Sequence, residues 1–160
     1  MKLVKSKPEL LDEEVTILNS DYFFNQISKN KDVYTKEEIL DIIQESQRIG
    51  AERFLIQKDN QYVGILELLM KNPNDGYPWL GLLQIHKDTQ GHGYGNEVMD
   101  LFYTIMQERG VKTFRLGVID VNEPGHRFWK RQGMIPVKSV IDKDGKKIIV
   151  YEKDIVFQSE

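Results

Sequence analysis

The chain has 160 residues, of which 40% are hydrophobic and 29% are charged, and its formal net charge at pH 7 is −3. This length predicts one domain over residues 1–160, and the weakly acidic balance argues against nucleic acid as a partner. Because the sequence contains no cysteine, disulfides, thiolate catalysis and zinc–thiolate sites are excluded. No apolar run reaches membrane-spanning length and the N-terminus lacks a signal-peptide core, so we expect a cytoplasmic protein that does not bind membranes.

A short strand and a helix are predicted at the N-terminus. Leu3 and Val4 indicate the strand, and Ser6 with Glu9 makes a capping-box pattern that predicts the start of the helix. The helix is expected to end at the polar break formed by residues 19–21.

Four apolar residues cluster after this break, namely Tyr22, Phe23, Phe24 and Ile27. They fit either a helical turn that covers the core or part of the wall around a substrate. Because large aromatic side chains are usually well buried, the core interpretation is favoured for most of them. The chain then continues as a polar connection to residue 34.

A second capping box predicts the next helix. Thr35 stands three residues before Glu38, and the helix is expected to end at Gly50, a residue type that suits a helix C-terminus. The apolar residues of this segment recur at helical spacing and predict a buried stripe made of Ile39, Ile42, Ile43 and Ile49.

Three strands are predicted after this helix. The first begins at residues 54–56, a hairpin turn follows at residues 59–60, and a long strand occupies residues 62–70. The third, residues 79–85, is apolar and follows a Pro- and Gly-containing turn. Glu67 is unusual because it lies in the middle of the apolar second strand. It faces either a cleft or the solvent, and the alternation of side chains along a strand favours solvent.

A glycine-rich loop connects the third strand to a long helix. Gly91, Gly93 and Gly95 alternate with other residues, and an apolar stripe at helical spacing follows and ends at Gly110. Glycine lets the backbone approach a ligand closely, and the first amides of a helix have no intrahelical partners. The order of strand, loop and helix therefore predicts a site for a phosphate or pyrophosphate group.

The C-terminal part of the chain predicts a parallel strand, a short helix and a hairpin. The strand, residues 113–119, follows a helix and is therefore expected to run parallel to the strand that precedes that helix. Asn122 fits the N-cap of the short helix, which ends at Gly133. Two further strands flank a turn at residues 144–145.

Two motifs carry a resemblance to a known family. Residues 90–95 read Gln-x-x-Gly-x-Gly, and residues 122–134 read NEPGHRFWKRQGM. In this order and at this distance they resemble the acetyl-CoA pyrophosphate loop and the later motif of the GCN5-related N-acetyltransferase (GNAT) family. The resemblance implies an α+β fold with a mixed, mostly antiparallel central sheet, helices on both faces, and a parallel strand pair that splays apart at the cofactor site.

The resemblance also implies the activity and the residues around the cofactor. An acetyl group would pass from acetyl-CoA to a primary amine, of a small molecule or a protein N-terminus, by direct attack. The backbone of Ile85 would contact the pantetheine arm, and Asn122 would form a hydrogen bond on the pantetheine side. Arg131 would meet a phosphate. The pyrophosphate would bind the loop residues Gln90, Gly91, His92, Gly93, Tyr94, Gly95 and Asn96, and the thioester would lie against Phe128 and Trp129.

The catalytic acid and base are less well marked. Many family members have a Tyr acid four residues before the motif's glycine, where this chain has Trp129, whose indole N–H is not a usable acid at neutral pH. Glu67 and His86 are the candidates for a base. We expect His126 to be exposed, and the histidines have no metal-ligand spacing, so no metal site is predicted.

Two other functions stay open at this stage. The chain could be a non-catalytic module that binds acyl-CoA without turnover, which would fit Trp129 and the missing base. It could also hold another nucleotide at the glycine loop, although neither the P-loop pattern nor the dinucleotide fingerprint is complete at Asn96 and Glu97.

The closing hairpin could pair with the edge of a second copy and form a homodimer.

Overall fold

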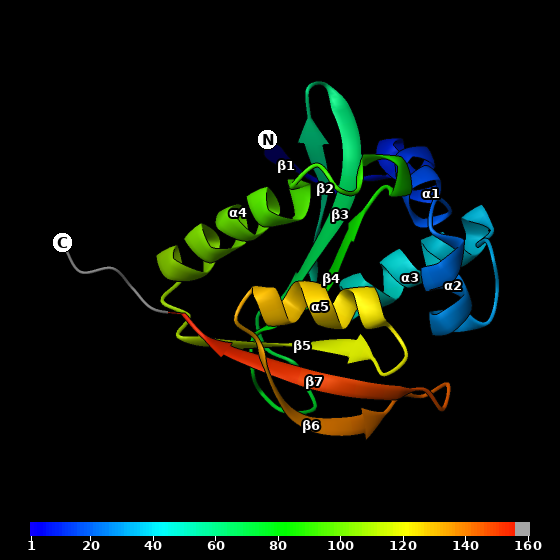
Figure 1. Cartoon of the computed structure of the whole chain (residues 1–160). Coiled ribbons are helices and arrows are strands. Elements are labelled where there is room, and N and C mark those ends of the chain that lie inside the picture. Colours follow the sequence, from blue (N-terminus) through cyan, green and yellow to red (C-terminus); the bar gives the residue numbers. More distant parts are fainter. Residues whose placement is uncertain (156–160) are drawn as a thin grey trace.

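The computed structural model describes residues 1–155, which form one mixed seven-stranded sheet with helices around it (Figure 1). The strand order is β1-β2-β3-β4-β5-β7-β6. The strands are β1 (Lys2–Lys5), β2 (Glu52–Lys58), β3 (Gln61–Leu69), β4 (Trp79–Ile85), β5 (Thr113–Ile119), β6 (Ile135–Ile141) and β7 (Lys147–Asp154), and the helices are α1 (Leu11–Leu18), α2 (Tyr22–Lys29), α3 (Lys36–Arg48), α4 (Tyr94–Glu108) and α5 (Glu123–Arg131).

Helices cover both faces of the sheet, as predicted. Val98, Met99 and Phe102 of α4 pack with Trp129 of α5 on one face. On the opposite face, α1 and α3 contribute a second apolar cluster that includes Ile17 and Ile39 together with residues of β2 and β3. In Figure 1, α4 lies at the left and α5 crosses the middle in front of the strands, whereas α1, α2 and α3 gather at the right.

Several local signals in the sequence are confirmed. Thr35 and Glu38 form the complete capping box of α3, because each side chain accepts from the other residue's backbone N–H. Asp59 and Asn60, at the tip of the β2–β3 hairpin, both have positive φ, of 51° and 63°, as a tight hairpin turn requires.

Two predicted details of the helices are wrong. Ser6 does not cap a helix: its hydroxyl donates to Glu14 at 2.5 Å, a 3-10 turn occupies Pro8–Leu10, and α1 begins at Leu11. The buried charge of Glu14 requires hydrogen bonds and takes this donor. Ile49 is exposed instead of belonging to the buried stripe, because α3 ends at Arg48 and the chain turns away there.

The parallel strands β4 and β5 separate soon after they meet. Within residues 1–155 they pair at one register position, Trp79 with Arg115, whereas the other neighbouring strands are antiparallel and pair over most of their length. A β-bulge in the β3–β4 ladder lies between Glu67 and Leu68 and leaves Gly81 without a partner in the register. A bulge bends its strand, and this one lies where β4 begins to leave β5.

Candidate active site

A cleft of about 580 Å³ occupies the space between the diverging ends of β4 and β5. Residues 80–85 of β4 form one wall and residues 116–119 of β5 form the other. The glycine-rich loop and the start of α4 border it, α5 lies along it, and α2 with its N-cap also contributes to its lining. Because β4 and β5 pair only at Trp79–Arg115, backbone groups along their facing edges can face a ligand, although the carbonyls of Ile85 and Ile119 accept from Gln90 and Asn122.

The glycine-rich loop forms an open cradle at the start of α4. Gly91 and Gly93 have positive φ, of 85° and 78°, and a Cβ placed on either would meet no atom within 4 Å. Gly93 is the N-cap of α4 and carries no side chain to cap the first turn. The amides of Tyr94 and its neighbours are therefore left for a ligand.

Most of the predicted loop residues line the cleft, but not all do. Gln90 lines it, and its side-chain amide donates to the carbonyl of Ile85 at 3.0 Å, which ties the loop to the end of β4. Asn96 also lines the cleft, and its amide oxygen accepts from Gln132 at 2.6 Å. His92 is exposed and does not belong to the described lining.

The second motif places its side chains along α5. Asn122 caps the helix by accepting from the N–H of Gly125 at 3.1 Å, and it also lines the cleft. Phe128 and Trp129 meet edge to face, with ring centroids 4.8 Å apart, and the exposed residue Arg131 also lines the cleft. A Cβ on Gly95 would lie 2.9 Å from the ring of Phe128, so the glycine lets α4 and α5 approach each other.

His126 is buried, and the expectation that it is exposed is wrong. Its Nε2 lies 3.0 Å from the carbonyl oxygen of Asp120 and its Nδ1 lies 2.6 Å from the hydroxyl of Tyr151. Because a carbonyl can only accept, Nε2 carries the proton and the Tyr151 hydroxyl donates to Nδ1. The histidine thus connects α5, the end of β5 and β7 beside Asn122.

Glu67 is buried as well, and the favoured solvent-facing interpretation is wrong. Arg53 donates to Glu67 at 2.6 Å and to Glu14 at 2.6 Å, so one guanidinium holds two carboxylates. Glu67 lies behind the cleft wall at Gly81, since a Cβ added to Gly81 would be 3.6 Å from the Cγ of Glu67. Glu67 itself is not one of the described lining residues. A buried carboxylate requires such a cation, and the sequence pattern alone does not reveal one.

The second candidate base, His86, follows the last residue of β4. Its Nδ1 accepts from the N–H of Asp88 at 3.1 Å. His86 caps a 3-10 turn at Lys87–Thr89, and it is not among the described residues that line the cleft.

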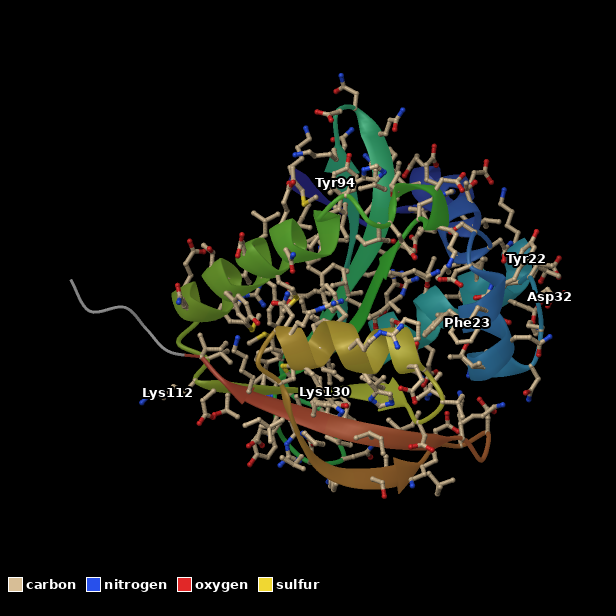
Figure 2. All side chains as sticks on the ribbon, viewed as in Figure 1. Tyr22, Phe23, Asp32, Tyr94, Lys112 and Lys130 are labelled. Atoms are coloured by element: carbon tan, nitrogen blue, oxygen red, sulfur yellow. The ribbon has the colours of Figure 1, made fainter. Side chains whose placement is uncertain are left out.

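Helix α2 contributes to the wall of the cleft, and its N-cap Asp21 accepts from Gln90 of the glycine-rich loop at 3.5 Å. Phe23 and Phe24 line it, together with Asp21, which caps α2 by accepting from the N–H of Phe24. Tyr22 and Phe23 are 60% and 48% exposed, so the core interpretation is wrong for both. Figure 2 shows these two side chains on α2, on the opposite side of the view from Lys112, with Tyr94 near the top at the start of α4.

Two contacts connect the end of α2 to the turn between β6 and β7. Lys29 lies 2.7 Å from the carboxylate of Asp144, and Lys146 donates to the side chain of Asn30 at 2.6 Å. We call these two contacts the clasp. The clasp ties the helix that carries Phe23 and Phe24 to the C-terminal hairpin, over a separation of more than a hundred residues in the sequence.

Gln84 is a cleft residue that the sequence analysis did not identify. It lies in β4, is 6% exposed and belongs to the cleft lining. Its side-chain oxygen, Oε1, is buried and has no hydrogen-bond partner within the described part of the chain. The available signal was one amide side chain between Leu83 and Ile85 in an otherwise apolar strand.

The described residues hold no group of three or more His, Cys, Asp or Glu side chains that could bind a metal ion. Across residues 1–155, no helix combines the length and the apolar character needed to cross a membrane.

Solved structures of other proteins share this fold. The chain superposes on an acetyltransferase from Thermus thermophilus with a TM-score of 0.78 and 22% identity, covering 96% of each chain. It superposes on a Salmonella typhimurium acetyltransferase that modifies the N-terminal serine of ribosomal protein L7/L12 with a TM-score of 0.77 and 16% identity, covering 96% of this chain and 94% of that one.

A third similar structure is the spermidine N-acetyltransferase of Vibrio cholerae in complex with CoA and spermine, with a TM-score of 0.73 and 12% identity, covering 96% of this chain and 95% of that one. A search of curated proteins gives no match. The model of the acetyltransferase (GNAT) family matches residues 13–134, which is most of the chain. The chain therefore belongs to the GNAT family of acetyltransferases, which use acetyl-CoA.

Proposed function

We propose that this chain is a single-domain N-acetyltransferase that transfers an acetyl group from acetyl-CoA to a primary amine by direct attack. The observation that carries the proposal is the divergence of β4 from β5 after the pair Trp79–Arg115, directly beside an uncapped glycine-rich helix start. This arrangement offers free strand backbone for an amide-containing arm and free helix amides for its phosphates in one continuous cleft.

The residues of the cleft fit acetyl-CoA. The open space around Gly91 and Gly93 would accept the pyrophosphate, which the amides of residues 90–96 would bind. The end of β4 at Ile85 and the side chain of Asn122 would bond the pantetheine arm. Phe128 and Trp129 would form the apolar wall near the thioester, and Arg131 would pair with a phosphate.

The reaction forms a C–N bond and breaks the C–S bond of the thioester. The amine nitrogen attacks the carbonyl carbon, the amine loses one proton, and the thiolate of CoA leaves and takes up a proton. Backbone amides at the strand ends would stabilise the oxygen of the tetrahedral intermediate. Because Trp129 is not an acid, the leaving thiolate would take its proton from water.

Glu67 and His86 remain our candidates for the base that accepts the amine's proton. Glu67 is held by Arg53, and His86 follows β4 and caps the 3-10 turn at Lys87–Thr89. Glu67→Gln and His86→Gln test them separately. A general base contributes about 10²- to 10⁴-fold, so the correct variant loses that much kcat and its pH profile flattens. A variant that keeps its kcat excludes that residue.

The acceptor would be a small-molecule amine or a protein N-terminus. Two structurally similar proteins are described as acting on an N-terminal serine and on spermidine. Phe23 and Phe24 of α2, with its N-cap Asp21, would border the acceptor. The exposed apolar side chains of the edge strand β6, such as Ile135 and Ile141, would suit a homodimer contact.

Calorimetric titration with acetyl-CoA, with ATP and NAD as controls, tests the cofactor. We expect binding to acetyl-CoA only, lost in Gly93→Glu. Gly50→Glu is a matched control, because Gly50 also has positive φ and open space around its Cβ position but lies at the end of α3. Equal loss in both variants, or no binding by the folded protein, overturns the proposal.

An amine screen then separates catalysis from binding alone. Thiol release is measured with spermidine and with a set of tetrapeptide amides, one for each N-terminal residue. Release with at least one amine supports an enzyme, whereas acetyl-CoA binding without release on any amine favours a non-catalytic acyl-CoA-binding module.

A further inference from the structure

Gln84 is a buried polar side chain whose amide does little for the fold. The side chain is almost completely removed from solvent, and its one hydrogen bond runs from Nε2 to the carbonyl of Ile17 at 3.4 Å. That carbonyl already accepts from the backbone N–H of Ser20 at 3.2 Å and from the Ser20 hydroxyl at 2.7 Å. The bond to Gln84 is thus a long third bond to an oxygen that is already satisfied.

The amide oxygen of Gln84 has no partner at all among residues 1–155. The orientation of the amide is fixed by its neighbour, since the carbonyl of Ile17 can accept only from the nitrogen. Burying an unpartnered oxygen destabilises a protein, and an apolar residue of the same size would remove that cost. Stability alone therefore does not explain a glutamine at this position.

The position of Gln84 favours a role toward the amine. It lies in the wall formed by β4, beyond the point where β5 has separated. Its contact with Ile17 places the side chain on the face that carries α1. The chain continues from α1 into α2, whose residues Phe23 and Phe24 line the cleft, whereas α4 and α5, which carry the cofactor motifs, pack on the opposite face of the sheet.

The chemistry of an amide suits this role better than that of a carboxylate. A primary amine keeps N–H groups whether or not it carries the extra proton, so Oε1 can accept from the reactive, deprotonated form. A carboxylate would instead stabilise the ammonium form, which has no lone pair for attack.

We propose that Gln84 is a positioning residue for the acceptor: its side chain turns into the cleft and Oε1 accepts one N–H of the amine. The turn gives up only the long contact with Ile17, and Nε2 becomes free to donate to water or to the substrate. This inference rests on the proposed acetyltransferase function.

The test compares Gln84→Met, which keeps the length of the side chain but has no hydrogen-bonding amide, with Gln84→Glu, which keeps an acceptor oxygen. Gln61→Met is the matched control, because Gln61 is an exposed glutamine at the start of β3. For each protein we measure Tm, the Kd of acetyl-CoA by calorimetry, and KM and kcat for the best amine of the panel formed by spermidine and the tetrapeptide amides.

In Gln84→Met we expect kcat/KM for the amine to fall by about tenfold to a hundredfold, mainly through KM. The Kd of acetyl-CoA stays within about twofold and Tm does not fall, because no structural bond of consequence is lost. Gln84→Glu retains more of the amine's kcat/KM than Gln84→Met does, and Gln61→Met behaves as the wild type.

Three outcomes overturn the inference. If KM for the amine is unchanged in Gln84→Met, Gln84 does not contact the acceptor. A weaker Kd for acetyl-CoA at unchanged amine KM assigns Gln84 to the cofactor, and a lower Tm with equal losses in both variants makes it structural. If the wild type turns over none of the amines, the proposed function itself is wrong. This result is obtained before any variant is made.

Discussion

The hydroxyl of Tyr151 lies 2.6 Å from Nδ1 of His126, and both residues are buried. Burial raises the pKa of the Tyr151 hydroxyl, which keeps its proton for donation to the ring. The opposite ring nitrogen is bonded to the carbonyl of Asp120, just before Asn122. The pair therefore fixes the loop between β5 and α5, which leads to the cleft residue Asn122.

Tyr151→Phe should reduce the free energy of unfolding by about 1–3 kcal/mol, because Nδ1 of His126 is left buried without a donor. Urea denaturation measures this loss. We also expect weaker acetyl-CoA binding, since Asn122 is no longer held as firmly. Tyr103→Phe is the control for acetyl-CoA binding, which it should leave unchanged, because it removes a hydroxyl that accepts from Lys153 outside the cleft lining. Equal stability of Tyr151→Phe and the wild type would contradict the assigned hydrogen bond.

Arg53→Met should be one of the most damaging single substitutions in the described chain. It leaves the carboxylates of Glu14 and Glu67 buried without their shared cation, and breaking a buried ion pair costs about 3–5 kcal/mol. The measurement is the midpoint of urea unfolding. Arg48→Met, which removes an exposed partner of Glu45 on α3, should change little. A small effect of Arg53→Met would show that the two carboxylates find other partners.

Trp129→Phe should lower stability more than it lowers catalysis. The indole is buried against the core, so a smaller ring leaves a cavity and costs about 1–3 kcal/mol. Because an indole N–H does not act as an acid, kcat for an accepted amine should stay within about threefold of the wild type. A larger loss of kcat, with the Kd of acetyl-CoA unchanged, would assign Trp129 a role in the chemical step.

Glu38 should make a contribution to stability that disappears in acid. Its bonds to Lys31 and to the backbone of Thr35 lower its pKa from 4.5 to about 2. Since the pKa in the folded state is depressed, the contribution is complete above about pH 4.5 and is lost as the pH falls toward about 2. The difference in Tm between the wild type and Glu38→Gln should therefore shrink over this range. A difference that does not depend on pH would rule out the charge as its cause.

Asp144→Asn should loosen α2 without unfolding the protein. The pKa of Asp144 is lowered by the hydrogen bond from Lys29, so the carboxylate is charged at neutral pH and the clasp is intact. Both side chains are partly exposed, and Tm should barely change. Hydrogen exchange of the backbone amides of α2 should become faster, and high salt should have the same effect on the wild type. Unchanged exchange in α2 would show that Asn30 and Lys146 hold the helix alone.

The sequence by itself was sufficient where a property depends on neighbouring residues. The capping box of Thr35 and Glu38 and the turn at Asp59–Asn60 are local, because their hydrogen bonds and backbone angles involve residues a few positions apart. The glycine-rich loop and the motif that begins at Asn122 are also local patterns, and they were enough to indicate the family and the fold class.

The tertiary structure decided every property that depends on residues far apart in the chain. Arg53, which pairs with Glu67, lies in another strand, and Tyr151, which bonds to His126, is 25 residues away in the sequence. The Ser6 hydroxyl donates to Glu14 instead of capping a helix. The exposure of Phe23 and the isolation of Gln84 Oε1 likewise follow from which elements pack beside them. Burial and hydrogen bonding are relations in space, and a pattern of residue types along the chain does not contain them.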